Sequence, residues 1–340
     1  MAETEAKDRE PASLPRVSVI IPVKNGERHL PRCLESLEKQ DYPAELVEVL
    51  VADGRSTDRS REIARSWGAT VLDNPRQKQV AGRNLAFAAS RGERIALCDD
   101  DCVMDPEWLR NSLKYFADPS VGGVGGPTLL PEDEGSFGRA VAVLFQLGVW
   151  IAGSVQREDV DRVREVDDIP GGNAIYRREA LARVMPIDED FLSGEDVELN
   201  FQLRRAGFRI LAVPDVVVWH YKRQSPRELW RQMYRFAVGR VKNGRRDRSM
   251  IRPGHVLAGL SLPLVLAAVA AAAALGPWAL GALAAAAALG AVSLVAGGWW
   301  MSGSLAVAGQ VPLVLGVGAA AWSAGFLREV VWPYRHVAMR

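Results

Sequence analysis

This sequence of 340 residues contains few cysteines and has almost no net charge. It holds three cysteines, Cys33, Cys98 and Cys102, and an odd number without paired spacing excludes a disulfide framework and fits a reducing cytosol. The formal net charge of +1 excludes a polyelectrolyte, and we expect no nucleic-acid partner. Residues 1–15 are charged and lack the apolar core of a secretory signal, so we expect a flexible tail there.

Two nucleotide-binding signatures are also absent. No Gly-x-Gly-x-x-Gly follows the first apolar run and no Gly-x4-Gly-Lys-Ser/Thr occurs anywhere, so a dinucleotide-binding or P-loop site loses its main support. The sequence instead alternates short β-branched runs with helical patterns, and the predicted strands are 17–23, 46–53, 70–72 and 94–101. Runs this apolar are typical of parallel strands buried on both faces, so we predict a doubly wound, mostly parallel α/β domain.

Charge almost disappears from the C-terminal part of the chain. Residues 256–275, 278–297 and 305–327 carry no charge, and about 20 apolar residues suffice to cross ~30 Å of hydrocarbon. We therefore predict about three transmembrane helices within residues 256–327, followed by a tail, 328–340. A soluble bundle of alanine-rich helices is the alternative.

A basic segment, 222–255, precedes the first predicted span. Between Lys222 and Arg252 there are eleven Lys and Arg residues against two acids. Such a segment could contact nucleic acid, lie at a membrane surface or form a solvated tail. The apolar stretch that follows favours an interfacial segment at an anionic leaflet, and the positive-inside rule then places the preceding domain in the cytosol. Three spans would leave the basic tail outside, so either one span is re-entrant or the larger N-terminal bias dominates.

Polar residues gather where the predicted strands end, at 24–26, 53–56 and 99–101. Because parallel strands end at one edge of a sheet, ligands bind there. Asp99, Asp100 and Asp101 would repel one another, and a divalent cation such as Mg²⁺ or Mn²⁺ would offset that repulsion. Strand alternation would point Asp99 and Asp101 the same way. A solvated turn is one alternative, and a zinc site on Cys98 and Cys102 is another, weakened by the absence of a second ligand pair.

A second acidic site stands at the start of a predicted helix, at Glu195 and Asp196. The helix dipole favours carboxylates there, which is a purely structural explanation. The glycines at 171 and 172 permit either close approach of a ligand or a plain turn. The apolar run of about 13 residues after Arg139 is too short to span, so it forms either a core helix or a segment resting on the membrane.

Several of these stretches together resemble the family 2 glycosyltransferases, which have the GT-A fold. The stretches are "VSVIIPVKNGERHLPRCLESLEKQDYP", "VEVLVADGRSTDRSREIA", the Asp-x-Asp at 99–101, "PGGNAIYRREAL" and "LSGEDVELNFQLRRAGFRI". The resemblance covers residues 17–235 and implies a GT-A domain at 16–235. The sequence around Asp53 and the C-terminal spans are most similar to the membrane-attached branch near succinoglycan-type glucosyltransferases.

The resemblance implies which residues bind the donor. Asp99 and Asp101 match the aspartates that hold Mg²⁺ or Mn²⁺ on the sugar-nucleotide diphosphate, and His220 matches a further metal or phosphate ligand of some relatives. The remaining positions of the donor region are Pro22, Asn25, Asp53, Arg83 and Asp100. Of these, Asp53 matches the acid that contacts the base or ribose, and Asp100 is the variable middle position of the motif.

The resemblance also implies the catalytic and acceptor residues. Asp196 matches the general base, and Glu195 orients the base or the acceptor. The acceptor or phosphate region would contain Gly171, Gly172, Asn173, Gln232 and Arg235. The last two belong to a degenerate Gln-x-x-Arg-Trp motif in which Phe236 replaces the tryptophan.

The resulting hypothesis is an inverting, metal-dependent, multi-pass glycosyltransferase of the cell membrane with a cytoplasmic catalytic domain. It would move a sugar from a nucleotide sugar, with UDP favoured and GDP possible, to a lipid-linked or glycan acceptor. The alternatives are a processive membrane polysaccharide synthase and a membrane-anchored sugar-nucleotide-binding protein without catalysis.

Overall fold

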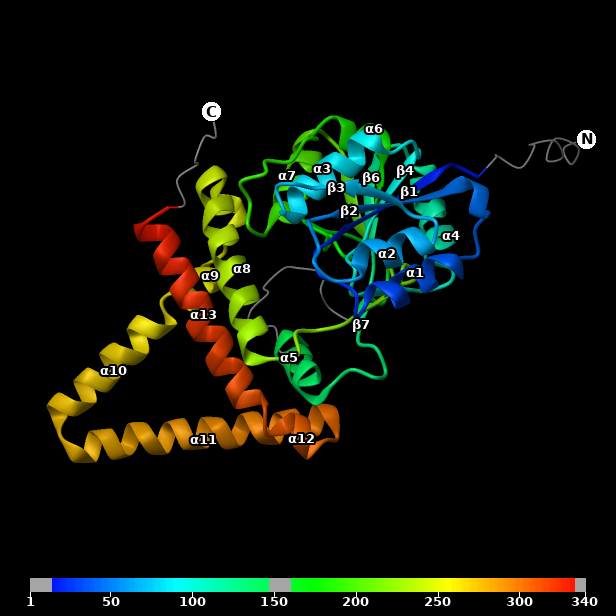
Figure 1. Cartoon of the computed structure of the whole chain (residues 1–340). Coiled ribbons are helices and arrows are strands. Elements are labelled where there is room, and N and C mark those ends of the chain that lie inside the picture. Colours follow the sequence, from blue (N-terminus) through cyan, green and yellow to red (C-terminus); the bar gives the residue numbers. More distant parts are fainter. Residues whose placement is uncertain (1–13, 147–159, 334–340) are drawn as a thin grey trace, which may run out of the picture.

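The computed structural model describes residues 14–146 and 160–333 of the chain. Most of the two expected tails therefore lies outside the described residues, as does the end of the apolar run after Arg139. The described chain forms an α/β domain with a helical region beside it (Figure 1).

An eight-stranded sheet forms the centre of the α/β domain. β1 pairs in parallel with β2 and β4, and β2 with β3, whereas β9 runs antiparallel to both of its neighbours, β4 and β6. β10 is parallel to β6, and β8 is antiparallel to β10. In sheet order the strands are β3 (Thr70–Asp73), β2 (Val47–Asp53), β1 (Val17–Val23), β4 (Arg94–Leu97), β9 (Ala174–Arg177), β6 (Val121–Gly125), β10 (Arg209–Ala212) and β8 (Arg164–Glu165).

Helices cover both faces of this sheet and create two apolar cores. One core contains Leu34, Trp108 and Val218, and the other contains Val80, Tyr176 and Leu203. Every residue of β1 is buried, as the continuous apolar run predicted. The helices of this domain are α1 (Leu30–Glu38), α2 (Ser60–Ser66), α3 (Gln79–Ala89), α4 (Trp108–Leu113), α6 (Arg178–Ala182) and α7 (Glu195–Arg205), with 3₁₀ turns at Ala44–Leu46 and Lys114–Ala117.

A small second sheet contributes to the site. It consists of β5 (Cys102–Met104), β11 (Val218–His220) and β7 (Thr128–Leu129), in the order β5-β11-β7. β11 is antiparallel to β5, and their register pairs His220 with Cys102. His220 therefore lies beside the acidic turn, although the two segments are far apart in the sequence.

The helical region follows β11 and begins with the long basic helix α8 (Pro226–Arg246). A 3₁₀ turn at Arg248–Met250 leads to α9 (Pro253–Gly259) and α10 (Ser261–Leu275), and then to α11 (Pro277–Ser302), α12 (Leu305–Ala308) and α13 (Val311–Val331). Helices α10 and α11 form an arm that leaves the α/β domain, and α13 returns beside α8 (Figure 1). An apolar core joins α8 and α13 to α5 (Ser136–Gln146).

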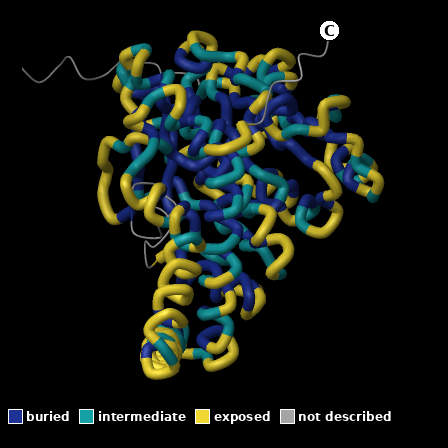
Figure 2. The backbone as a smooth tube through the Cα atoms, turned by 90° about the vertical axis from the view of Figure 1, so that its left-hand side faces the viewer, coloured by how far each residue is buried: buried dark blue, intermediate teal, exposed yellow. Residues whose placement is uncertain are grey.

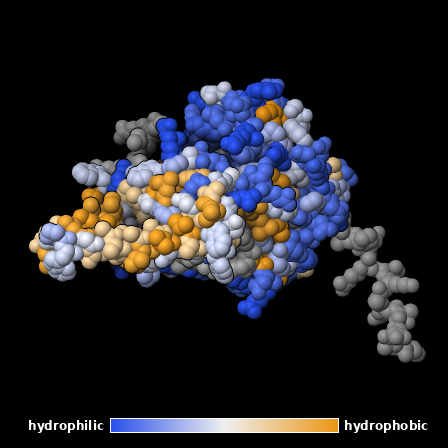
Figure 3. Space-filling model, turned by 90° about the horizontal axis from the view of Figure 1, so that it is seen from below, coloured by the Kyte–Doolittle hydropathy of each residue, from blue (hydrophilic) through white to orange (hydrophobic). Residues whose placement is uncertain are grey.

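Two helical stretches are long and apolar enough to cross a membrane. They are Pro277–Ser302 and Leu305–Val331, and the bent pair Pro253–Gly259 and Ser261–Leu275 makes a third if it counts as one span. The arm is exposed along most of its length (Figure 2), and its surface is apolar (Figure 3). This composition agrees with the fold class predicted from the sequence.

Helix α13 contacts α5 near its start and α8 near its end. Near its start, Gln310 Nε2 donates to Ser136 Oγ of α5 at 2.8 Å. Near its end, Glu329 Oε1 lies 3.2 Å from Arg245 Nη1 of α8. The end of α8 is itself bound to α7, because Arg246 Nη1 lies 3.1 Å from Glu198 Oε1. In this arrangement α13 runs beside α8, which lies between it and the α/β domain (Figure 1).

Candidate active site

The three aspartates after β4 form a turn, and their side chains point to three different places. The strand ends at Leu97, so strand alternation does not orient them. Asp99 Oδ1 accepts from Gln79 Nε2 at 2.7 Å. Asp100 lies against Gly26 of the loop after β1, where any Cβ would overlap its carboxylate. Burial, together with the charges of Asp101 and Asp99, raises the pKa of Asp100 to about 8.

Asp101 faces the second sheet and the residues that follow it. Its Oδ1 lies 3.0 Å from His220 Nε2, and its Oδ2 accepts from Arg223 Nη1 at 2.9 Å. Burial alone would raise the pKa of Asp101, but His220 and Arg223 hold it well below its usual range. Asp101 is therefore an anion at any ordinary pH.

The residues around Asp101 fit a divalent cation. Ligand atoms of Asp101, Cys102 and His220 lie within 4.8 Å of one another. Burial raises the pKa of the Cys102 thiol well above its usual value, and Sγ donates to the Gly172 carbonyl at 3.4 Å, so it stays a thiol. His220 Nε2 is buried without a hydrogen bond of ordinary geometry. The remaining donors are the Asp101 carboxylate, which suits Mn²⁺ or Mg²⁺, and the His220 imidazole, which is a ligand for transition metals.

Arg83 of α3 ties the acidic turn to the second acidic site. Its guanidinium is buried, with Nη2 3.1 Å from Asp99 Oδ1 and Nη1 2.9 Å from Glu195 Oε1. Nη2 also donates to the Gly171 carbonyl at 3.1 Å. The residue that the resemblance placed at the donor thus bridges the two halves of the site.

Helix α7 begins at the cavity because Gly194 adopts a left-handed conformation, with φ of 82°. Burial raises the pKa of Glu195 to about 7; the Arg83 charge opposes this rise and the Asp196 charge adds to it. Asp196 Oδ1 accepts from the Val197 amide at 2.9 Å, and Oδ2 accepts from the Gly171 amide at 3.4 Å. These bonds fix the Asp196 carboxylate at the rim of the cavity.

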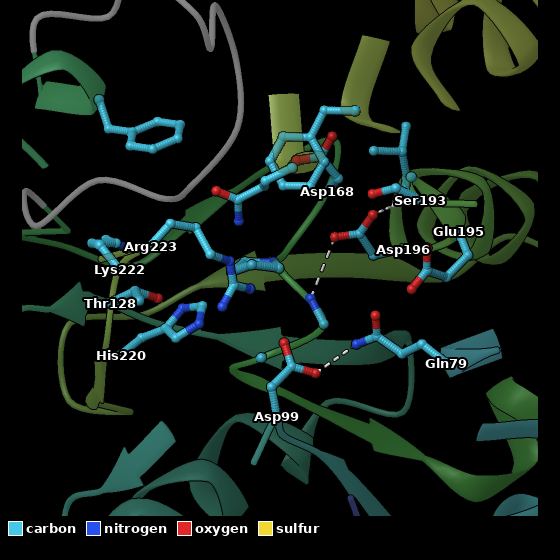
Figure 4. Close-up of a pocket in the computed structure, with 18 of the residues that line it drawn as sticks. Gln79, Asp99, Thr128, Asp168, Ser193, Glu195, Asp196, His220, Lys222 and Arg223 are labelled. Atoms are coloured by element: carbon cyan, nitrogen blue, oxygen red, sulfur yellow. Dashed lines mark hydrogen bonds between the residues drawn. The ribbon is translucent and has the colours of Figure 1, made fainter. Parts of the chain in front are cut away.

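A cavity collects about half of the residues expected in the site. Figure 4 shows Asp99 with Gln79 on one wall, Glu195 and Asp196 on a second, and His220, Lys222 and Arg223 on a third. The expected residues that line the cavity are Arg83, Asp99, Gly171, Gly172, Glu195, Asp196, His220 and Gln232.

Other expected donor residues lie at the edge where the strands end. The side chain of Asp53 is fully buried and accepts from the Ser56 amide and from Arg61 Nη1, the latter at 3.1 Å. Asn25 has a positive φ of 57°, and its Oδ1 accepts from the Thr57 amide at 2.8 Å. Pro22 lies in β1 beside Ala52. These bonds link the loops after β1 and β2 into one surface next to the acidic turn.

Two expected acceptor residues lie away from the cavity. Asn173 is fully buried: its Oδ1 accepts from Trp108 Nε1 at 2.9 Å, and its Nδ2 donates to the carbonyls of Pro127 and Val216. All of these partners are structural. Arg235 lies on the exposed side of α8, whereas Gln232 and Phe236 of the same motif line the cavity.

Several cavity residues were not identified from the sequence. Asp168 precedes the glycine turn, and burial and the Asp196 charge raise its pKa to about 6. Its signal was the acidic stretch at 165–168. Trp322 of α13 also lines the cavity, but its apolar surroundings indicated only a membrane span. The others include Gln79, Thr128, Phe145, Lys222, Arg223 and Arg240.

The fold and the site together define a class of protein. A mostly parallel sheet places carboxylates at its strand ends, opposite an acidic helix start, and this is the architecture of GT-A transferases. The solved structure of the mannosyltransferase PcManGT from Pyrobaculum calidifontis, in complex with GDP-Man and Mn²⁺, has the same fold. Its TM-score is 0.65 at 23% identity, covering 96% of this chain and 90% of that one.

The family follows from the sequence comparison. The model of Glycosyl transferase family 2 matches residues 18–185, so this domain belongs to that family and the chain is a glycosyltransferase. It is 29% identical to the succinoglycan biosynthesis protein ExoA of Rhizobium meliloti (strain 1021), over 94% of this chain and 96% of that protein. It is 27% identical to the glycosyltransferase AglE of Haloferax volcanii, over 73% and 80%. The resemblance seen in the sequence is confirmed.

Proposed function

We propose that this glycosyltransferase transfers one sugar from a nucleotide sugar to a lipid-linked or glycan acceptor, with inversion and with a divalent cation. The observation that carries the proposal is that Asp99 and Asp196 face one cavity from two walls while Arg83 holds the walls together (Figure 4). A donor sugar between these walls would have a cation on its diphosphate side and a base on the other.

Asp101 and His220 are the residues that would hold the cation, with Asp99 beside them on the acidic turn. When bound, a divalent cation neutralises the charge that develops on the leaving diphosphate. Mn²⁺ accompanies GDP-Man in the PcManGT structure, which supports both Mn²⁺ and a GDP-sugar as candidates. A UDP-sugar and Mg²⁺ remain the other candidates for this chain.

The donor would lie along the loops after β1 and β2 and across the acidic turn. Pro22 and Asn25 would shape the surface for the base, and the buried Asp53 carboxylate holds the loop after β2 in place. Arg223 bonds Asp101 and also lines the cavity, so its guanidinium would lie beside the diphosphate. Lys222 would add a second positive charge on the same wall.

Asp196 would act as the general base. Its carboxylate is held by two backbone amides and faces the cavity, so it can take the proton of an acceptor hydroxyl. Attack from the side opposite the leaving group inverts the configuration at the anomeric carbon. Glu195 would not contact the acceptor in this scheme, because its Oε1 is bound to Arg83.

The membrane would deliver the acceptor. Phe236 of α8 and Trp322 of α13 form part of the cavity wall, so helices outside the α/β domain complete the site. A relative from Methanococcus voltae, 25% identical over 70% of this chain, is named as acting on a dolichyl N-acetyl-α-D-glucosaminyl phosphate. We infer a multi-pass protein of the cell membrane whose catalytic domain faces the cytosol, as the basic segment 222–255 favours.

A transfer assay on membranes tests this proposal. Radiolabelled UDP- and GDP-sugars are supplied with Mn²⁺ or Mg²⁺, with and without EDTA, to the wild type and to Asp196→Asn and Asp167→Asn variants. We expect the wild type to transfer sugar and EDTA to abolish this activity. Asp196→Asn should reduce the transfer rate by at least ~100-fold, whereas Asp167→Asn should leave it unchanged. Transfer that is indifferent to EDTA would exclude the cation, and wild-type rates in Asp196→Asn would exclude this base.

A further inference from the structure

Charge is distributed unevenly around the cavity. His220, Lys222 and Arg223 lie together on one side, next to Asp101 and the proposed diphosphate position (Figure 4). Asp168 and Asp196 lie on another side, where the acceptor of the proposed reaction would bind. Arg240 also lines the cavity near these two carboxylates, so an acceptor group on that side meets two carboxylates and one guanidinium.

Asp168 is a prominent feature of the acceptor side. Its carboxylate makes no hydrogen bond or ion pair within residues 14–146 and 160–333, yet the residue lines the cavity. Burial raises the pKa of Asp168, the Asp196 charge raises it further, and the Arg240 charge opposes both. The Asp168 residue is half-buried, and a partly desolvated carboxylate without a protein partner favours a ligand that donates hydrogen bonds to it.

Gln232 of α8 complements Asp168. It lines the same cavity, and its amide also has no hydrogen-bond partner among the described residues. An amide both donates and accepts, which suits a ligand carrying hydroxyl groups. Phe236, one turn further along α8, and Trp322 of α13 add aromatic surface beside these polar groups. Apolar walls with a few convergent polar groups are typical of small-molecule sites.

An anionic acceptor fits this side poorly. The phosphate of a bare lipid phosphate would meet the two carboxylates of Asp168 and Asp196 against the single guanidinium of Arg240, which already donates to the Met250 carbonyl. The carboxylates outnumber the cation there, and like charges in a desolvated site repel. A phosphate oxygen is also ionised already, so it would need no general base, whereas a sugar hydroxyl needs one. Both considerations favour a neutral nucleophile.

We propose that the acceptor is a hydroxyl group of a neutral sugar already attached to its carrier, and that Asp168, with Gln232, determines acceptor specificity by binding its neighbouring hydroxyls. This inference rests on the proposed function. In the reaction the acceptor O–H gives its proton to Asp196, and its oxygen forms the bond to the anomeric carbon. The bond from that carbon to the nucleoside diphosphate breaks, and the diphosphate leaves with the electron pair.

The first test compares two kinds of acceptor with the full-length protein in detergent. Undecaprenyl phosphate is one probe, and octyl glycosides of glucose, galactose, mannose and N-acetylglucosamine are the other. We expect transfer to at least one glycoside and none to undecaprenyl phosphate. Transfer to undecaprenyl phosphate without transfer to any glycoside would overturn the inference but leave the proposed function standing. Absence of both transfer and donor hydrolysis would overturn the proposed function as well.

The second test concerns Asp168 itself. Asp168→Asn should raise the KM for the glycoside on the order of ten-fold, because a charged hydrogen bond is lost, with little change in the donor KM. Asp167→Asn is the matched control, since that carboxylate is 57% exposed and pairs with Arg204 and Arg252 instead. Gln232→Ala, on a different helix, should also raise the acceptor KM. Unchanged acceptor KM values in both cavity variants would refute the role.

Discussion

Arg83 offers the sharpest test of how the two halves of the site are held together. Its side chain is 3% exposed and bonds both Asp99 and Glu195, so Arg83→Met removes a buried positive charge at nearly constant volume. Arg83→Lys keeps the charge but cannot reproduce the fork that reaches both carboxylates. We expect the methionine variant to lose more stability and activity than the lysine variant.

The magnitude follows from the burial of the partners. Removing one partner of a buried ion pair costs about 3–5 kcal/mol, which for a domain of this size lowers the melting temperature on the order of 10 °C. Most of the lost stability comes from the Glu195 carboxylate, which would be left unpaired with its side chain only 7% exposed. The Asp99 side chain is 23% exposed, so water can solvate its carboxylate. Protonation of Glu195 limits the loss, so the effect of Arg83→Met should be larger at pH 8 than at pH 5.

A double-mutant cycle isolates the interaction. Melting temperature and transfer rate are measured for the wild type, Arg83→Met, Glu195→Gln and the double variant. With glutamine at 195 there is no buried charge left to neutralise, so Arg83→Met should cost half as much or less in that background. An equal cost in both backgrounds, or a cost below about 1 kcal/mol in the wild type, would refute the bridging role.

Three other perturbations test the packing, the protonation and the membrane topology. Gly171→Ala should reduce specific activity and melting temperature strongly because its Cβ would lie 2.6 Å from Arg83 Nη1, whereas Gly172→Ala should be milder because its nearest neighbour, Asp99 Oδ2, would lie at 3.2 Å. The pKa of Glu195 is about 7 in the folded protein against an ordinary 4.5, so protonation of Glu195 stabilises the folded state fully below pH 4.5 and this stabilisation is lost as the pH rises through 7. The difference in pKa corresponds to about 3 kcal/mol of unfolding free energy. The melting temperature should therefore fall between pH 4.5 and pH 7, and a rise over that range would contradict the prediction. A reporter fused to the C-terminus should lie on the same side of the membrane as the catalytic domain, because both ends of α13 contact helices bound to that domain, and opposite sides would contradict this packing.

The fold was largely predictable from local patterns. Apolar runs predicted β1, β2 and β3, and β1 is buried along its whole length, as expected for a strand covered on both faces. The antiparallel strand β9 and the second sheet were not predicted, since their short strands have no distinct period in the sequence. The register of that sheet places His220 against Asp101, so the acidic motif alone could not predict that these two residues meet.

The acidic turn shows why the site was only partly predictable. Sequence spacing suggested that Asp99 and Asp101 point the same way, but the strand stops at Leu97 and the turn sends the two side chains to different partners. Similarly, Arg83 has ordinary helical surroundings in the sequence, and only the packing of α3 against α7 turns it into a bridge. Long-range pairing, which no local pattern encodes, decides both cases.

Trp322 shows that the cavity is formed by the α/β domain together with the helices that follow it. Its surroundings in α13 are apolar, so the sequence predicts a span there, yet its side chain lines the same cavity as Asp196. Its indole Nε1 donates to the His255 carbonyl at 3.2 Å, which ties α13 to α9 at that point. Any movement of α13 relative to α8 would therefore move one wall of this cavity. Residues 16–235 alone would lack this wall, so they should not be expected to reproduce the acceptor selectivity of the full chain.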